Sequence, residues 1–112
     1  MNYIKITKQD MDLQRRLIET FKKTLKALPT GRLSAKKIKG RVYYYHVDEK
    51  TGKQTYIPKS NLTFIHELKE KRWLQKAIRI MEKNLKAQEQ MLKFYQAYDA
   101  QTIMDMLPDC CW

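Results

Sequence analysis

The stretch AKKIKGRVYYYHVDEKTGKQTYI, from Ala35 to Ile57, decides the fold. Its central run, RVYYYHV at 41–47, consists almost wholly of β-branched and aromatic residues, which predicts a strand. A turn signal precedes this strand at Lys39-Gly40. A second turn follows over Asp48 to Lys53, where Gly52 suits a positive φ angle. Because the stretch is also rich in Lys and Tyr, it raises the question whether the sheet binds a polyanion.

Weaker strand patterns lie on both sides of the central strand. Leu33 to Lys39 alternates imperfectly, and Gln54 to Ile57 ends before Pro58. Three strands joined by short turns predict an antiparallel β-meander over 32–57. In the central strand, alternation places on one face Val42, Tyr44 and His46, and on the other Arg41, Tyr43, Tyr45 and Val47. In a domain this small, only one of these faces can lie on helices.

A helix is predicted before the meander, over residues 8–28. Thr7 fits its N-cap, and apolar residues then follow at helical spacing. Pro29 and Gly31 end the pattern. The polar side of this helix is basic.

A long helix is predicted after the meander, over residues 61–98, with Ser60 or Asn61 as its cap. A 3-4 spacing marks its seam, which consists of Leu74, Ile78, Met81, Leu85, Gln88, Leu92 and Tyr95. The simplest interpretation is that the seam packs on the first helix, and dimerisation, with Gln88 setting the register, is the alternative. A helix of this length is longer than the rest of the domain needs, so we expect its distal half to pair with another chain, fold back or project. A short tail, 99–112, follows, with helical character as far as Leu107.

Size favours one domain over residues 1–112, and the predicted order of helix, β-meander and long helix makes it an α+β domain. The chain has 43% hydrophobic and 31% charged residues, and no apolar run approaches the length of a membrane span. The N-terminal decapeptide lacks the apolar core of a signal peptide, so we expect a cytoplasmic protein and no membrane partner. Cys110 and Cys111 are adjacent, which is poor geometry for a disulfide, and we assign them no role.

The positive charge is unevenly distributed. The net charge is +11, and residues 29–61 hold eight basic and two acidic side chains, whereas residues 62–112 are almost balanced. A field of one sign attracts a partner of the opposite sign, such as nucleic acid or an acidic protein surface. Simple solubility is the alternative explanation.

The meander supplies the candidate binding residues. Basic side chains would contact phosphates and tyrosine rings would stack on bases or ribose. The predicted contacts are Lys36, Lys37, Lys39, Arg41, Tyr43, Tyr45 and Lys53, extended by Arg15, Arg16, Lys22 and Lys23 of the first helix. In the alternative, the tyrosines are core and the lysines protect a sheet edge from aggregation.

Motifs of enzymes are absent from the sequence. It has no Gly-rich phosphate loop and no nucleophile or zinc-protease signature, so we predict neither catalysis nor a cofactor. Asp48 and Glu49 lie together in a turn, where turn chemistry explains them better than a metal-dependent nuclease does. His46 and His66 are isolated, so we predict no metal site, and His46 is interpreted as a sheet residue with a satisfied ring.

The order of motifs resembles a known module. The stretch LPTGRLSAKKIKGRVYYYHVDEKTGKQTYIPKSN, 28–61, is similar to a module of Firmicutes prophage and mobile-element proteins, in which a helix ends in LPxGxL and a basic hairpin, a YYY strand and a long charged helix follow. The likeness covers roughly residues 10–98. Longer relatives continue into a restriction-endonuclease-like domain, whose activity we do not carry over to this chain. Some proteins of this kind resemble type II-A anti-CRISPR inhibitors.

A second, more local resemblance is to the three-stranded arm-binding domain of phage integrases. There a DxxTGK turn, here Asp48 to Lys53, joins two strands that read DNA. The likeness covers residues 36–57 and does not include a catalytic integrase domain.

These resemblances and the charge give three functional hypotheses. The first is inhibition of a type II-A RNA-guided Cas nuclease. A basic chain is a poor mimic of DNA, so it would engage guide RNA or an acidic surface of the nuclease and disturb guide loading or effector assembly. The second is a DNA-binding accessory protein of a mobile element. The third is an interaction module that dimerises through the long helix.

Overall fold

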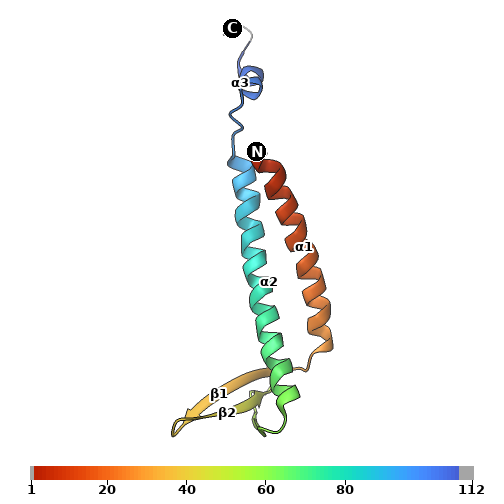
Figure 1. The fold of residues 1–112 in the computed structure, drawn as a ribbon, viewed down its shortest axis with the longest axis vertical. Helices are drawn as coiled ribbons and strands as arrows, with labels where there is room; N and C mark the ends of the chain where they lie inside the picture. Colours follow the sequence, from red (N-terminus) through yellow and green to blue (C-terminus); the bar gives the residue numbers. More distant parts are fainter. Residues whose placement is uncertain (1, 109–112) are drawn as a thin grey trace.

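The fold is an antiparallel pair of helices with a small sheet at one end (Figure 1). A computed structural model describes residues 2–108 of the chain. Its elements are α1 (Tyr3–Ala27), β1 (Arg32–Ile38), β2 (Arg41–Val47), β3 (Gln54–Ile57), α2 (Leu62–Phe94) and α3 (Ala100–Met106). The molecule is elongated, with principal extents of 77 × 29 × 27 Å. The predicted α+β architecture of helix, meander and long helix is confirmed.

The first helix begins five residues earlier than the sequence predicted. Asn2 is its N-cap, since the Asn2 side-chain oxygen accepts a hydrogen bond from the Lys5 N–H at 3.0 Å. The prediction that Thr7 caps the helix is wrong, because Thr7 lies inside α1 and is buried with the inter-helix seam. The helix ends at Ala27, before Pro29, as expected.

The long helix is slightly shorter than predicted. Asn61 is its cap and accepts a hydrogen bond from the Phe64 N–H at 3.4 Å, whereas the predicted end at residue 98 is wrong because α2 ends at Phe94. The predicted tail contains the short helix α3, whose N-cap is Asp99. In Figure 1 α3 lies beyond the end of the helical pair that is remote from the sheet. Cys110 and Cys111 fall outside the described residues.

The predicted seam of α2 packs on α1 within the same chain. Met11 and Ile18 of α1 and Leu74 and Ile78 of α2 are buried there. At the far end the rings of Tyr3 and Tyr95 lie 5.4 Å apart, so the distal half of α2 is paired along its length. The seam is therefore an intramolecular core, and it is not available for a dimer unless α1 is displaced.

One layer of the seam is polar. Gln14, which is buried, donates from Nε2 to Gln88 Oε1 at 2.7 Å and to Asp10 Oδ2 at 2.9 Å, and Gln88 Nε2 donates to the same carboxylate oxygen at 2.7 Å. Gln14 Oε1 is buried and has no hydrogen-bond partner among the described residues. Because these bonds require the two helices to stand in one register, Gln88 fixes the alignment of α2 on α1 rather than of two chains.

The three strands form the predicted antiparallel meander in the order β1-β2-β3. Its register pairs Leu33 with His46, Ala35 with Tyr44, and Tyr44 with Ile57. Leu33 and Ile57 share one face and pack with Ile65 and Leu68 of α2, with Tyr44 against this cluster. The face of Val42, Tyr44 and His46 is thus the one that lies on a helix.

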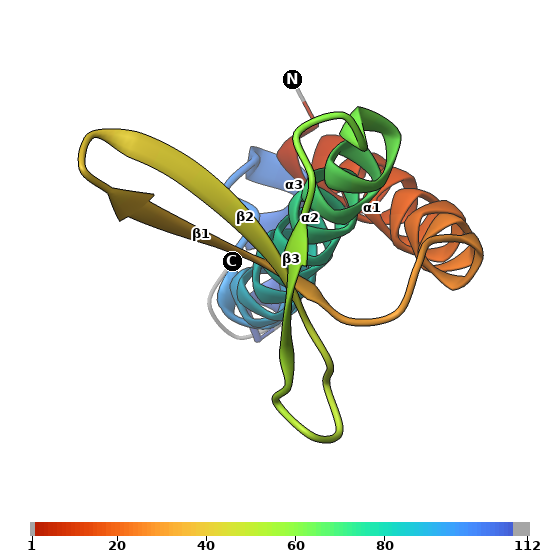
Figure 2. The same cartoon turned by 90° about the horizontal axis from the view of Figure 1, so that it is seen from below.

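The hairpin of β1 and β2 projects sideways from the helical pair (Figure 2). Lys39 and Gly40 form its turn with φ angles of 50° and 79°, the pattern of a type I′ turn. Residues 35–42, which we call the hairpin arm, are all exposed. The arm therefore carries its side chains clear of the helices.

The polar layer gives a test of what sets the stability of the helical pair. We expect Gln14→Leu/Gln88→Leu to raise the free energy of unfolding by roughly 1 kcal/mol, because it removes a buried oxygen without a partner and fills the seam with apolar atoms. Urea denaturation followed by circular dichroism measures the change. The exposed change Gln90→Leu is the control and should leave the midpoint unaltered, whereas a lower midpoint in the double variant would contradict this account.

Candidate nucleic-acid interface

The face of the sheet that points away from α2 carries three tyrosines. Tyr43 and Tyr45 of β2 lie on it by alternation, and Tyr56 joins them because it pairs with Tyr45 in the register. The Tyr56 ring centroid is 6.3 Å from that of Tyr43 and 5.8 Å from that of Tyr45. We call this cluster the tyrosine face. Its rings support one another, so they are held in place without being fully buried.

Cations surround the rings of the tyrosine face. Lys36 Nζ stands 4.6 Å from the centroid of Tyr45, and Lys59 Nζ stands 5.6 Å from that of Tyr43. Lys36 also donates to Gln54 Oε1 across the strands, which fixes its position. Arg41 lies on the same face at the outer end of β2. The strand residues of this face include no acid, so its field is of one sign.

This combination of rings and cations suits a strand of nucleic acid. Aromatic side chains stack on bases of any sequence, and neighbouring lysines neutralise the phosphates between them. A carboxylate-rich protein surface would use the cations but not the rings. The alternative in which the alternate tyrosines are core holds only for Tyr44, because Tyr43, Tyr45 and Tyr56 lie on the opposite face.

The other predicted meander residues lie around this face rather than on it. Lys37 pairs with Val42 and so points to the opposite face of the arm. Lys39 stands at the tip, in the turn, and Lys53 lies beside the second turn, where its N–H donates to Thr51 Oγ1 at 3.2 Å. All three side chains are exposed. Lys37 and Lys39 belong to the arm and are placed to contact a ligand that wraps it, whereas Lys53 belongs to the second turn, outside the arm.

The bases of α1 do not extend this surface as expected. Arg15 forms ion pairs with Asp12 at 3.2 Å and with Glu89 at 3.6 Å. Glu89 lies about 40 Å along α2 from its first residue, at about 1.5 Å per residue, and so is far from the sheet. Arg16 is adjacent to Arg15 in α1. Lys22 lines a hollow between the helices with Arg79, and Lys23 forms an ion pair with Glu19, so none of these four bases joins the tyrosine face.

Two residues of the face escaped the sequence analysis. Tyr56 alternates with the buried Ile57 in β3, and that alternation alone could have placed it beside Tyr43 and Tyr45. Lys59 lies beyond the strand, after Pro58, and reaches back over Tyr43. No sequence pattern predicts such a return, because it depends on the path of the chain between β3 and α2.

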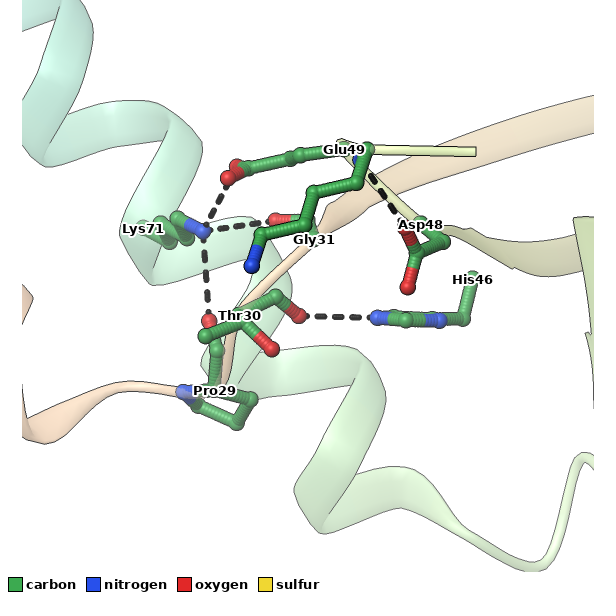
Figure 3. Close-up of polar contacts among 8 residues, drawn as sticks. Pro29, Thr30, Gly31, His46, Asp48, Glu49 and Lys71 are labelled. Carbon is green, nitrogen blue, oxygen red and sulfur yellow. Dashed lines mark hydrogen bonds and ion pairs between the residues drawn. The ribbon is translucent and has the colours of Figure 1, made fainter. Parts of the chain in front are cut away.

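Lys71 of α2 ties the sheet to the helix (Figure 3). Its ammonium donates to the carbonyl oxygens of Gly31 at 2.7 Å and of Pro29 at 3.2 Å, and it forms an ion pair with Glu49 at 3.1 Å. The Lys71 side chain is only 12% exposed. One ammonium group therefore binds the carbonyl oxygens of the loop before β1 and the carboxylate of the turn after β2.

Gly31 is required at this junction. Its φ angle is +91°, and a Cβ at this position would lie 2.1 Å from His46 Nε2. The His46 ring packs edge-on against Phe64, and its Nε2 is 2.8 Å from the Thr30 carbonyl oxygen (Figure 3). His46 is thus a sheet residue with a satisfied ring, as predicted.

Both acids of the second turn have structural partners. Asp48 accepts hydrogen bonds from the backbone N–H groups of Thr51 and Lys50, which lower the pKa of its carboxyl below the usual value. Glu49 pairs with Lys71. Within residues 2–108, no three His, Cys, Asp or Glu side chains gather as a metal site would need. The turn chemistry expected for both acids accounts for Asp48, whereas Glu49 is held by its ion pair with α2.

Replacing Lys71 tests how firmly the sheet is held. We expect Lys71→Met to lower the free energy of unfolding by about 1–3 kcal/mol, because two carbonyl oxygens and one carboxylate lose their donor. Thermal and urea denaturation measure the loss. Lys86→Met, at an exposed position of the same helix, should change little. An unchanged midpoint in Lys71→Met would show that water replaces the ammonium at no cost.

No protein-family model, curated protein or solved structure matches this chain. The resemblance to the prophage module therefore remains an expectation from the motifs. Among residues 2–108, no helix combines the length and the apolar character needed to cross a membrane.

Proposed function

We propose that the tyrosine face binds single-stranded RNA and that the protein acts in this way as an inhibitor of a type II-A RNA-guided Cas nuclease. Its ligand would be the guide RNA, and binding would interfere with guide loading or effector assembly in the cytoplasm of a bacterial host. The observation that carries the proposal is one sheet face with three tyrosines, flanking cations and no acid. The choice of nuclease rests on the likeness of residues 28–61 to the prophage module.

Single-stranded RNA fits this face better than a duplex does. Bases of a duplex are stacked on one another and leave the rings no partner, whereas an unpaired strand offers its bases for stacking. The α2 cluster packs on the other side of the sheet, and on this side Tyr56 is exposed and Tyr43 and Tyr45 are half-buried, although Val47 at the inner end of the same face is buried. The +11 charge of the chain agrees with a polyanionic ligand and argues against imitation of DNA in the basic channel of a nuclease.

A second candidate function is favoured by the hairpin arm. Lys37, Lys39 and Arg41 are exposed on a two-stranded ribbon that projects from the body. Two-stranded ribbons fit the major groove of DNA. The arm would then serve as the contact of a DNA-binding accessory protein of a mobile element, and the integrase-like turn lies between β2 and β3 of the same sheet.

Removing rings tests the RNA proposal. We expect Tyr45→Ala/Tyr56→Ala to weaken binding of a single-stranded RNA of about 12 nucleotides by about tenfold or more, since each stacked base contributes about 1–3 kcal/mol. Fluorescence anisotropy with labelled RNA measures the affinity. Tyr45→Phe/Tyr56→Phe keeps the rings and should bind as the wild type does. Tyr98→Ala, at an exposed tyrosine remote from the sheet, is the control.

A guide-loading assay then tests the inhibitor itself. The purified effector receives guide RNA in the presence of excess protein, and loading and cleavage are measured. Wild-type protein should reduce both, and Tyr45→Ala/Tyr56→Ala should reduce neither. Normal loading and cleavage with wild-type protein at large excess would refute the inhibitor proposal, even where RNA binding itself is observed.

Salt dependence distinguishes the DNA-binding candidate. If the arm contacts duplex DNA, a plot of the logarithm of the binding constant against the logarithm of the salt concentration should have a slope of about −0.9 for each phosphate neutralised. Replacing Lys36, Lys37, Lys39 and Arg41 by Ala should then flatten the slope by up to about 3–4 units. Titrations at several salt concentrations measure it. A slope that does not change would exclude these four side chains as phosphate contacts.

A further inference from the structure

One long side of the helical pair is apolar and uncovered. On α1 the residues Ile6, Leu13 and Leu17 are exposed, and on α2 Trp73, Ile80 and Phe94 are exposed. Trp73 is 62%, Ile80 49% and Leu13 48% exposed, although the seam between the helices is already filled by other residues. Each helix thus has a second apolar stripe that its packing within the chain does not use.

The two stripes lie on the same side of the pair. Arg15 and Glu89 meet across the helices at 3.6 Å and mark the charged side. Phe21 and Trp73 meet at 5.6 Å between ring centroids and mark the other side. Leu17 and Leu13 precede Phe21 by one and two turns, and Ile80 follows Trp73 by two turns, so both stripes run along the side of the aromatic contact. We call this surface the apolar side.

Small and polar uncharged residues lie between the large residues of the apolar side, and the exposed acid Glu70 lies three residues before Trp73 at its sheet end. Ala77, Asn84 and Ala87 lie between the large residues of α2, at helical spacing from Trp73 and Ile80. Asp10 is the one acid near the stripe of α1, and hydrogen bonds from Gln14 and Gln88 already occupy its carboxylate. Large exposed side chains alternating with small ones are what a groove for a third helix requires.

Basic residues flank the apolar side on both helices. Arg16 lies three residues after Leu13, and Lys76 and Lys83 each lie three residues after Trp73 and Ile80, so these cations stand along the outer edges of the stripes. Among the described residues, none of the three forms an ion pair. A second copy of the chain would bring the same cations against each other. A helix with acidic edges would instead pair with them.

We propose that the apolar side is a docking surface for an amphipathic helix of a partner protein whose edges carry Glu or Asp. The apolar face of that helix would cover Leu13, Leu17, Trp73 and Ile80, and its acids would meet Arg16, Lys76 and Lys83. The result is a three-helix bundle built on the pair. This surface is separate from the tyrosine face, so the proposal does not depend on RNA binding.

The test uses two synthetic helices that differ only in charge. Both are about 21 residues long, or about 31 Å as a helix, with Leu along one face; one has Glu and the other has Lys at the flanking positions. We expect the full chain to bind the Glu peptide at micromolar concentrations and the Lys peptide at least about tenfold more weakly. Anisotropy of the labelled peptides measures both affinities. Equal binding of the two peptides, or no binding of either, would overturn the proposal.

Variants place the binding on the apolar side. Leu13→Gln/Ile80→Gln should weaken binding of the Glu peptide by about tenfold or more. The control Leu62→Gln, at a still more exposed leucine at the start of α2, should not. Lys76→Glu/Lys83→Glu should reverse the preference between the peptides. Retained preference in this charge reversal would exclude the predicted pairing. Because the changes are at exposed positions, circular dichroism should show an unaltered fold.

Competing occupants give distinct results. If sedimentation shows a dimer that Leu13→Gln/Ile80→Gln dissociates, a second copy of the chain covers the apolar side. If the protein binds anionic vesicles and the same variant does not, the apolar side binds a membrane surface. Either result overturns the proposal. Tyr45→Ala/Tyr56→Ala should keep the Glu peptide affinity of the wild type. Failure of RNA binding and failure of peptide binding are therefore separate outcomes.

Discussion

The ammonium group of Lys71 is the contact on which the arrangement of the molecule depends. It reaches from α2 to the carbonyl oxygens of Pro29 and Gly31 and to the carboxylate of Glu49. These groups belong to the loop that leaves α1 and to the turn that leaves β2. A single side chain thus holds the entry of the sheet and its second turn against one helix, and the glycine at residue 31 lets the loop approach His46 closely enough for this to happen.

The orientation of the tyrosine face follows from that junction. The sheet has a small core of its own, formed by Leu33 and Ile57 against Ile65 and Leu68, which fixes which face is covered. Apolar contacts of this kind do not specify direction strongly, whereas hydrogen bonds to three separate groups do. The junction therefore determines where the arm and the rings point, and the apolar cluster supplies the stability that keeps them there.

Much of the fold could be predicted from the sequence, because its signals were local. Each signal determines the backbone of only a few neighbouring residues: the run 41–47 forms a strand, the turn glycines take positive φ angles, and Asn61 caps a helix. The structure agrees with each of these predictions. The start of α1 was placed wrongly because Thr7 followed by Asp10 imitates a cap, while the real cap, Asn2, stands before a stretch of β-branched residues that weaken the helical signal.

The site was harder to predict because it depends on contacts between distant residues. The alternation of side chains along the strand predicted that Tyr43 and Tyr45 share one face. Lys59 and Lys71 could not be predicted, because only the folded chain brings them near the sheet. The basic residues of α1 were expected to extend the tyrosine face because the sequence shows their charge but not their distance from the sheet. Arg15 shows the error, since its partner Glu89 belongs to the opposite end of α2.

The two helices explain why one chain can present two unlike surfaces. A pair of helices has only one seam, so every apolar residue outside it must remain on the surface unless another element covers it. Here the sheet covers the first turns of α2 and leaves the sides of the pair free. The rings at the end and the apolar side along the length are consequently independent in position, and each is bordered by lysine or arginine. Under the two proposals above, a nucleic-acid strand at the end of the rod and an acidic protein helix along its length would be bound at the same time without competing for one surface.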